Sequence, residues 1–406
     1  MVEESNFKQK PNWGAIWAMS LCAMVLVASE FLPVSLLTPI SSDLNISAGQ
    51  AGQTIAISGL FALVSSLFLT SVIGNQDRRH VLLFLTMLVA YYGVLVAVAP
   101  NMIVLMIGRA LLGICIGGFW SMSAATTMRL VSKEFVPRAV AILNGGAALS
   151  STIAAPLGSY IGGIIGWRGV FFCVVPVVVI AFIWQWLSVP KLPVKIIKND
   201  KMQIVTVLKL MTRPVIAFGM LSTLLLFIGQ FSLFTYLRPF LETVTKLNIE
   251  MLSVILLSIG LAGLLGTSLI GYLMKNGMYS ILILTPLLMA VIVVALILFG
   301  SSFISVFILL IIWGFLITAG PTGWWIWLSK TLPEEAEAGG GLMVAVMQLA
   351  ITLGAGVGGL IFDYGGYKNT FVFSAVILIA ATITTFLTWR VNRRLISRSA
   401  VLHRID

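Results

Sequence analysis

The chain has 406 residues, of which 59% are hydrophobic and only 10% are charged, and its mean hydropathy is +1.06. This composition excludes a soluble globular protein, because such chains are only about half apolar and about a quarter charged. The net charge of +11 could indicate a nucleic-acid partner, but twenty of the 25 Lys and Arg residues fall at the chain ends and in alternate connections between apolar runs. This asymmetry is the positive-inside pattern of membrane proteins, so we expect no nucleic-acid partner and both termini in the cytoplasm.

Twelve apolar runs follow one another along the chain, each long enough to cross a hydrocarbon layer of about 30 Å. They lie at about 14–40, 50–73, 81–99, 102–128, 138–165, 169–189, 214–238, 250–273, 279–299, 303–329, 339–363 and 368–390. The first run is too long for the apolar core of a signal peptide and contains Glu30, so we expect it to be retained. The sequence therefore predicts an all-α polytopic membrane protein with twelve transmembrane helices.

A polar, lysine-rich stretch separates the first six runs from the last six. It predicts a cytoplasmic linker between two six-helix bundles. The expected organisation is an N-terminal bundle at 1–189, the linker at 190–213, a C-terminal bundle at 214–393 and a cytoplasmic tail at 394–406.

Two motifs recur at an offset of 200 residues, which indicates an internal repeat. The run EFLPVSLLTP at 30–39 matches QFSLFTYLRP at 230–239 in its phenylalanine and final proline, with glutamine in place of the acid. The run GWRGVF at 166–171 matches GYKNTF at 366–371 in its glycine, aromatic residue, cation and phenylalanine. Each half has an even number of spans, so we expect two pseudo-symmetric bundles related as parallel repeats.

Glu30 lies deep in the first span, where a charged side chain costs at least about 2.5–3.5 kcal/mol and is usually functional. Pro33 has no N–H for the carbonyl of Ser29, which is therefore left without its helical partner beside the acid. Arg109 is the only cation inside a span, and both charges lie about 12–15 Å below the outer ends of their helices. We predict Glu30 and Arg109 as the proton-coupling residues. The sequence does not show whether the two helices face each other.

Further candidates are polar, aromatic or small residues in or beside the spans. Gly113 and Gly117 predict a close approach to a neighbouring helix. Asp77 and Arg78 allow two interpretations, a solvated turn or a gate that links helix ends on the cytoplasmic side. The amides and aromatic residues expected to line a substrate cavity are Asn144, Gln230, Phe234, Tyr236, Trp324 and Gln348. Amides both donate and accept hydrogen bonds and aromatic rings stack on bases, although membrane tryptophans are often interfacial belt residues instead.

No hydrolase triad, phosphate-binding loop or metal-ligand spacing is visible, so we expect no enzymatic activity, no cofactor and no metal. The three cysteines, Cys22, Cys115 and Cys173, show no disulfide or metal pattern and are expected to be small packing residues. An ion gradient rather than ATP is the expected energy source.

The motifs resemble those of the major facilitator superfamily, in particular its drug:proton antiporter branch. The run LMIGRALLGICIG at 105–117 looks like the fourth-helix motif, whose arginine, here Arg109, is implied in proton transfer. The run APLG at 155–158 looks like the fifth-helix motif, with alanine in place of the usual glycine. Asp77 and Arg78 fit the loop motif after the second helix, but its glycine spacing and its following Gly-Arg pair are missing.

Within this family the chain resembles bacterial purine ribonucleoside efflux pumps. The matching runs are PNW at 11–13, EFLPVSLLTP at 30–39, GGFWSM at 117–122, GWR at 166–168, GQF at 229–231, FTY at 234–236 and RP at 238–239. The resemblance implies a monomeric, proton-coupled antiporter of the bacterial inner membrane that exports inosine, adenosine and guanosine; the range could extend to purine base analogues. A sugar or multidrug efflux transporter and a proton-coupled importer share the scaffold, and a polytopic membrane enzyme is the alternative from another class.

Overall fold

The computed structural model describes residues 11–402 apart from residues 75, 193–208, 276 and 334, and the described part is helical nearly throughout and contains no β-strand. The helices of the first half are α1 (Trp13–Ser35), α2 (Leu37–Asp43), α3 (Ala48–Ile73), α4 (Arg78–Ala97), α5 (Met102–Leu130), the 3-10 turn η1 (Lys133–Phe135) and α6 (Val136–Ser188). Those of the second half are α8 (Pro214–Thr235), α9 (Leu237–Thr243), α10 (Ile249–Leu273), α11 (Met278–Phe299), α12 (Phe303–Thr331) and α13 (Ala336–Leu402). The predicted all-α class is confirmed.

The two longest helices, α6 and α13, each join two spans at a single glycine. Gly166 has a φ of +75° and Gly366 a φ of +69°, in the left-handed region that favours glycine. Within the described residues, ten helical segments are long and apolar enough to cross a membrane, and α6 and α13 each supply one of them. Divided at their glycines, these segments correspond to the twelve predicted spans. The two glycines are 200 residues apart, so the break in the backbone recurs at the offset of the sequence repeat.

The first and seventh predicted spans, at about 14–40 and 214–238, are each interrupted by a break in the helix. α1 ends at Ser35 and α8 ends at Thr235, and each is followed after one residue by a seven-residue helix, α2 or α9. Pro39 and Pro239 have no N–H to donate to the carbonyls of Ser35 and Thr235, so the helical hydrogen-bond series stops there in both halves. Each proline is tolerated because it lies in the first turn of the short helix that follows.

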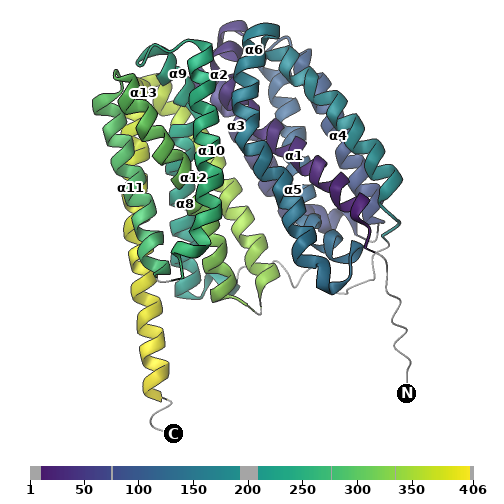
Figure 1. Ribbon diagram of the computed structural model, residues 1–406, viewed down its shortest axis with the longest axis vertical. Helices are drawn as coiled ribbons and strands as arrows, with labels where there is room; N and C mark the ends of the chain where they lie inside the picture. Colours follow the sequence, from purple (N-terminus) through teal and green to yellow (C-terminus); the bar gives the residue numbers. More distant parts are fainter. Residues whose placement is uncertain (1–10, 75, 193–208, 276, 334, 403–406) are drawn as a thin grey trace.

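Figure 1 shows two groups of helices side by side, one formed by α1 to α6 and the other by α8 to α13. The groups approach each other at the end of the molecule where α2 and α9 lie, and they spread apart towards the end that carries both termini. Contacts between the groups connect α2 with α9, α3 with α13 and α6 with α10. Each group buries an apolar cluster drawn mostly from its own helices, so each is a bundle with its own core.

The α3–α5 pair forms the part of the N-terminal bundle that carries Arg109. A Cβ atom at Gly113 would meet the carbonyl oxygen of Ser58, and one at Gly117 would meet the carbonyl oxygen of Ala62. Only glycine lets the two backbones approach this closely, which confirms the predicted close-approach face.

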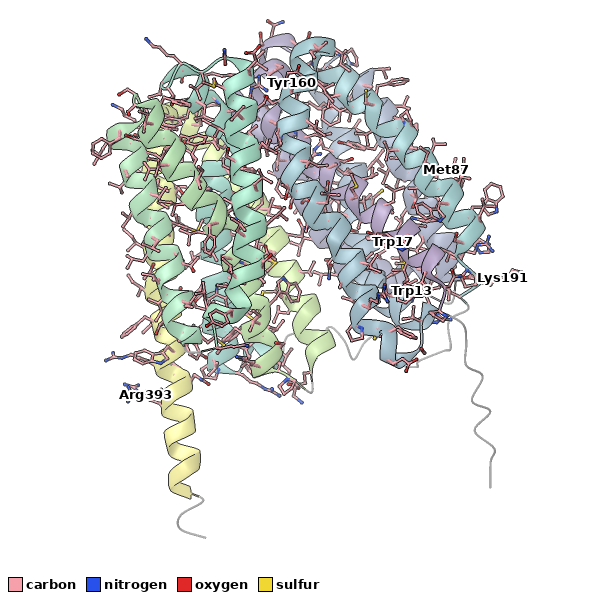
Figure 2. The ribbon with its side chains drawn as sticks, viewed as in Figure 1. Trp13, Trp17, Met87, Tyr160, Lys191 and Arg393 are labelled. Carbon is pink, nitrogen blue, oxygen red and sulfur yellow. The ribbon has the colours of Figure 1, made fainter. Side chains whose placement is uncertain are left out.

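The ends of the molecule differ in what they carry. Figure 2 shows Lys191 and Arg393 at the end where both termini lie and Tyr160 at the opposite end. The last helix, α13, continues to Leu402, beyond position 390 where the last predicted span ends, and leaves the bundle as the yellow helix in Figure 1.

Candidate functional site

Arg109 lies at the centre of a buried hydrogen-bond network between α1, α3, α4 and α5. Its side chain has no exposed surface. The Nε group donates to the carbonyl oxygen of Thr54 at 3.1 Å, and Nη2 donates to the Ser58 hydroxyl at 2.9 Å. Nη1 donates to the carbonyl oxygen of Ser29 at 2.7 Å and to the Tyr92 hydroxyl at 3.3 Å. The guanidinium fork therefore fixes three other helices around α5.

The carbonyl of Ser29 is available to Arg109 because of Pro33. Four residues separate them, so Pro33 occupies the position whose N–H would otherwise close the helical turn on this oxygen. The oxygen instead accepts from Arg109 and, at 3.3 Å, from the Tyr92 hydroxyl. The predicted break beside Glu30 thus becomes the acceptor for the buried cation, which needs several oxygen partners because a charge in a low-dielectric interior is costly without them.

Glu30 contacts Arg109 through its backbone and not through a carboxylate ion pair. Nη2 of Arg109 lies 3.5 Å from the carbonyl oxygen of Glu30. The three ion pairs found among the described residues involve other groups. Because the Glu30 side chain is partly exposed while Arg109 is fully buried, the two predicted residues are neighbours with different access to their surroundings.

An aromatic cluster connects the two halves next to Glu30. Phe31 on α1 stacks with Phe231 on α8, with ring centroids 6.3 Å apart and planes inclined by 28°. Phe31 also packs edge to face with Phe234 at 6.2 Å. Phe31 and Phe231 are the phenylalanines of the two repeated motifs, so the residues that directly follow Glu30 and Gln230 meet in one cluster.

Gln230 and Gln348 are the buried amides of the C-terminal bundle. Their exposed fractions are 4% and 8%, and their Oε1 atoms have no hydrogen-bond partner among the described residues. Gln348 lies on α13 at the contact with α3, where a Cβ atom at Gly59 would lie 3.2 Å from the backbone carbonyl oxygen of Gln348. A buried acceptor without a partner is costly in a folded protein, so such groups are candidates for ligand binding.

The remaining predicted cavity residues occupy different environments. Tyr236 is fully buried and donates to the carbonyl oxygen of Ala355 at 2.7 Å. Trp324 is only 1% exposed and packs edge to face on Trp327 at 5.1 Å inside the C-terminal core, whereas its neighbour Trp325 is 40% exposed.

Asn144 lies exposed on α6. Because Tyr236 and Trp324 are enclosed by packing, their rings offer no surface to a ligand in this conformation.

The end of the molecule where the bundles meet is held by two polar contacts that the sequence interpretation missed. Arg238 donates through Nη1 to the carbonyl oxygen of Ser35 in the other bundle and through Nε to Glu242 at 2.7 Å. Pro39 leaves the carbonyl of Ser35 without its helical N–H donor. This proline was therefore the sequence feature that could have indicated a contact at Ser35. Arg238 thus closes the end of α1 from the other half.

The second contact joins α13 to the start of α3. The carboxylate of Asp363 accepts from the Ser47 hydroxyl at 2.5 Å and from the backbone N–H of Gly49 at 2.8 Å. An acid at a helix N-terminus is stabilising because the first N–H groups lack helical partners and the helix dipole is positive there.

The predicted gate residues lie at the opposite end. Asp77 caps α4 by accepting from the backbone N–H of Arg79 at 2.9 Å, and it also accepts from the N–H of Leu192 at 2.8 Å. The backbone N–H of Arg78 donates to the carbonyl oxygen of Leu192 at 3.2 Å. These contacts attach the loop before α4 to the chain that follows α6.

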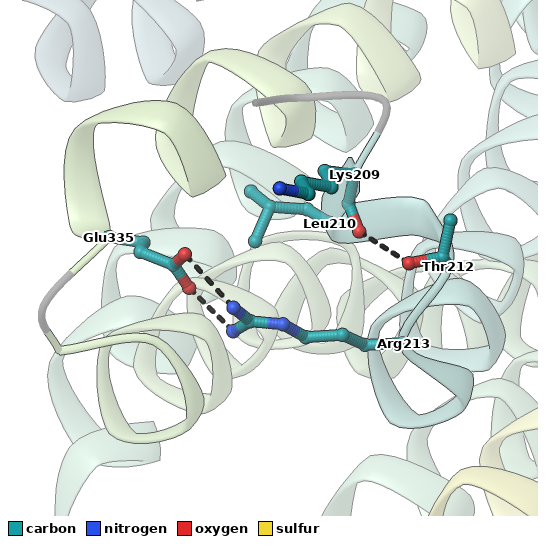
Figure 3. Close-up of a pocket in the computed structure, with 5 residues that line it drawn as sticks. All are labelled: Lys209, Leu210, Thr212, Arg213 and Glu335. Atoms are coloured by element: carbon teal, nitrogen blue, oxygen red, sulfur yellow. Dashed lines mark hydrogen bonds and ion pairs between the residues drawn. The ribbon is translucent and has the colours of Figure 1, made fainter. Parts of the chain in front are cut away.

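The C-terminal bundle has an ion pair of its own near the predicted linker. Arg213 binds Glu335 through two hydrogen bonds of 2.5 and 3.0 Å beside Lys209 and Thr212 (Figure 3). Both partners are at least one-third exposed, so the pair contributes little to stability.

No group of three or more His, Cys, Asp or Glu residues in the described part of the chain is placed to hold a metal ion. Cys22 and Cys115 are buried, and Cys173 is exposed on α6.

The family model of the Major Facilitator Superfamily matches residues 19–351 of the chain. The transcription regulatory protein OpdE of Pseudomonas aeruginosa is 51% identical over 385 residues, which cover 95% of this chain and 96% of that protein. The purine ribonucleoside efflux pump NepI of Salmonella typhimurium is 39% identical over 374 residues, which cover 92% of this chain and 93% of that protein.

Solved transporter structures share the fold at low sequence identity. A bacterial homologue of the human lysosomal transporter Spinster, in an inward-facing and unoccupied conformation, aligns with a TM-score of 0.77 over 94% of this chain and 97% of its own, at 14% identity. The nucleoside transporter NupG aligns with a TM-score of 0.76 over 92% of this chain and 98% of its own, at 11% identity. At these identities the likeness shows the arrangement of the helices alone.

Proposed function

Since the chain belongs to the Major Facilitator Superfamily, a family of membrane transporters, we propose that it is a proton-coupled antiporter that exports purine ribonucleosides from the bacterial cytoplasm. Inosine, adenosine and guanosine are the proposed substrates, and purine base analogues are a further class to test. In this proposal the chain is a monomer of the inner membrane with both termini in the cytoplasm, and it has no enzymatic activity.

The observation that carries the substrate proposal is a buried amide without a hydrogen-bond partner among the described residues next to an aromatic cluster between the two bundles. The Oε1 atom of Gln230 lacks a partner in the described part of the chain, and the residue directly precedes Phe231, which stacks on Phe31 in the cluster with Phe234. A purine offers a face that stacks on an aromatic ring, and its edges and ribose hydroxyls offer donors for an amide oxygen. The 39% identity to a purine ribonucleoside efflux pump over nearly the whole chain supports the same substrate class.

The proposed coupling device is Glu30 together with Arg109. Glu30 is partly exposed and can exchange a proton, whereas Arg109 is sealed within four helices and contacts the Glu30 backbone. A change in the charge of Glu30 changes the electrostatic environment of Arg109, which holds α1, α3 and α4 together. Protonation of Glu30 would therefore alter the packing of the bundle. If the termini are cytoplasmic, the closed end held by Arg238 and Asp363 is the outer end, and the conformation is inward-facing.

Asp77 and Arg78 are proposed to act when the bundles close at the cytoplasmic end. Their loop is hydrogen-bonded to Leu192, and Figure 2 shows the adjacent Lys191 towards the end where the bundles spread apart. Closure would bring this loop to the C-terminal bundle.

The direct test is uptake of radiolabelled inosine into inverted membrane vesicles that contain the chain. An acid-inside pH gradient should drive accumulation, and collapse of the gradient with an ionophore should abolish it. Vesicles with a Glu30→Gln variant at equal expression serve as the control for coupling.

Accumulation of arabinose or of a lipophilic cation in place of inosine would replace the nucleoside proposal with sugar or multidrug efflux. Inosine uptake that responds only to an alkaline interior would indicate import. Absence of gradient-dependent movement for all three probes would contradict proton-coupled export.

A further inference from the structure

An apolar groove on the N-terminal bundle lies between α1 and the two halves of α6. It has a volume of about 340 Å³. Its lining includes Trp17, Leu21 and Met24 from α1, Gly145 from the first half of α6 and Trp184 from the second. Trp17 is 51% exposed and Trp184 is 38% exposed, so the two tryptophans line an open groove rather than the core.

The groove offers few polar groups, and besides one hydroxyl its side-chain donors are the indole N–H groups of Trp17 and Trp184. Its only hydroxyl belongs to Ser20, which is 5% exposed and donates to the carbonyl oxygen of Ile142 at 2.7 Å. Two indole N–H groups cannot replace the hydration of a ribose and a purine edge, which carry both donors and acceptors, so a nucleoside would lose hydration in this groove. The lining instead fits a hydrocarbon chain.

The depth of the groove matches one leaflet of a bilayer. Along α1, which starts at Trp13, the groove extends from Trp17 to Met24, or from about 6 to about 16 Å at 1.5 Å per residue. Trp184 precedes the end of α6 at Ser188 by four residues, which is again about 6 Å. Half of a hydrocarbon core of about 30 Å is about 15 Å, so the groove occupies the leaflet at the end of the molecule that carries the termini.

A cation lies at the mouth of the groove. Trp13 and Arg138 each lie four residues, or about one helical turn, before a lining residue, Trp17 on α1 and Ile142 on α6. The guanidinium carbon of Arg138 lies 5.2 Å from the centre of the Trp13 ring, which connects the two helices at this mouth. Trp13 is nearer than Trp17 to the end with the termini (Figure 2). The ion pairs among the described residues involve other cations, so Arg138 keeps its charge available to an anion.

We propose that this groove is a binding site for one anionic phospholipid of the leaflet on the side of the termini. An acyl chain would lie between Trp17 and Trp184, and the phosphate would bind Arg138. An amphiphile of this kind matches the groove in polarity, depth and charge, whereas a neutral polar substrate matches none of them. The site is separate from the proposed nucleoside site, because Asn144 and Gly145 are adjacent on α6 and point in directions about 100° apart.

Native mass spectrometry of the purified, delipidated chain tests the proposal. The protein is titrated with phosphatidylglycerol or with phosphatidylcholine that carries the same acyl chains. Wild type should bind one phosphatidylglycerol more tightly than phosphatidylcholine. Arg138→Gln should weaken phosphatidylglycerol binding about five-fold, as expected for one cation near an anionic surface, and should weaken phosphatidylcholine binding less, so that the preference for phosphatidylglycerol is lost.

Gly145→Leu supplies a variant that fills the groove. A Cβ atom at Gly145 meets nothing within 4 Å, so the leucine has room to enter, and binding of both lipids at this site should be lost. Gly271→Leu on α10 is the matched control, because Gly271 is also exposed, helical and free of neighbours within 4 Å.

Equal binding of the two lipids by wild type, or wild-type lipid binding by Gly145→Leu, would overturn the proposal. Competition of inosine with phosphatidylglycerol would also overturn it and would assign the groove to substrate. If Gly145→Leu does not fold, the lipid selectivity of wild type and its loss in Arg138→Gln decide the question.

Discussion

Replacing Arg109 by lysine tests whether its fork geometry, rather than its charge, holds the N-terminal bundle together. In the structure Nε, Nη1 and Nη2 each serve a different acceptor, namely Thr54, Ser29 and Ser58. A lysine ammonium is a single point of charge and cannot reach all three acceptors. At least one buried acceptor then loses its hydrogen bond to the cation, at a cost of about 1–3 kcal/mol, which corresponds to about a five- to 150-fold loss in the population of the functional packing.

The proline in α1 makes this prediction specific. Pro33→Ala would provide the N–H that the Ser29 carbonyl lacks in the wild-type helix. It should therefore recover part of the loss caused by Arg109→Lys while giving no gain in the wild-type background. Pro286→Ala, at another proline inside a helix, is the control for a general effect of removing a proline.

The assay is a double-mutant cycle measured as gradient-driven inosine uptake in vesicles at matched expression, with the thermal midpoint of the purified protein as a second measure. A coupling energy of zero between Pro33→Ala and Arg109→Lys would refute the assignment of Ser29 as the partner of Arg109. Full activity of Arg109→Lys would refute the requirement for the fork.

Four further predictions concern single residues. Glu30→Gln should keep inosine exchange but lose gradient-driven accumulation, because the amide cannot titrate; uphill transport at the wild-type rate would remove Glu30 from coupling. Gln230→Leu should weaken inosine binding about ten-fold or more in a titration of purified protein, because the donors of the ligand lose an amide acceptor worth about 1–3 kcal/mol. An unchanged affinity for inosine would exclude Gln230 from the binding site. Asp363→Asn should loosen the closed end, because the charge at the α3 N-terminus is worth about 0.3–1 kcal/mol. The accessibility of the closed end is measured with Ser41→Cys on α2 in a Cys173→Ser background. This cysteine should react faster with an impermeant maleimide when Asp363→Asn is added, and an unchanged rate would contradict the role of Asp363. The hydrogen bond from Arg168 lowers the pKa of the Asp43 carboxyl, which lies outside the membrane-length helices. The Asp43–Arg168 pair therefore stabilises the fold above a pH of about 4, and this stabilisation is lost as the pH falls further. The thermal midpoint of Asp43→Asn should depend less on pH than that of wild type. An equal dependence on pH in the two proteins would contradict a stabilising role of the pair.

Local physics made the spans, the repeat and several special positions predictable from the sequence. A span needs only a long apolar run, and the left-handed kinks fall on Gly166 and Gly366, where the repeated motifs begin. Pro33 and Pro39 remove identifiable hydrogen bonds, so the freed carbonyls of Ser29 and Ser35 could be named without coordinates. The close approach at Gly113 and Gly117 also follows from residue size, which is a property of the sequence itself.

The partners of these groups were decided only by the tertiary structure. The carbonyl of Ser29 is bound by Arg109 and that of Ser35 by Arg238, and the second contact crosses from one bundle to the other. Such contacts join residues 80 and 203 positions apart, and nothing in the local sequence selects one arginine over another.

The directions of the side chains were also settled by packing. Trp324 is 1% exposed and Trp325 is 40% exposed, yet the sequence favoured Trp324 as a cavity residue. In a soluble helix the polar face reveals which side is buried, but a membrane helix is apolar towards both lipid and protein. The sequence therefore determines which segments cross the membrane. Only the contacts between helices determine which faces meet, because apolar side chains are equally suited to the lipid hydrocarbon and to the protein core.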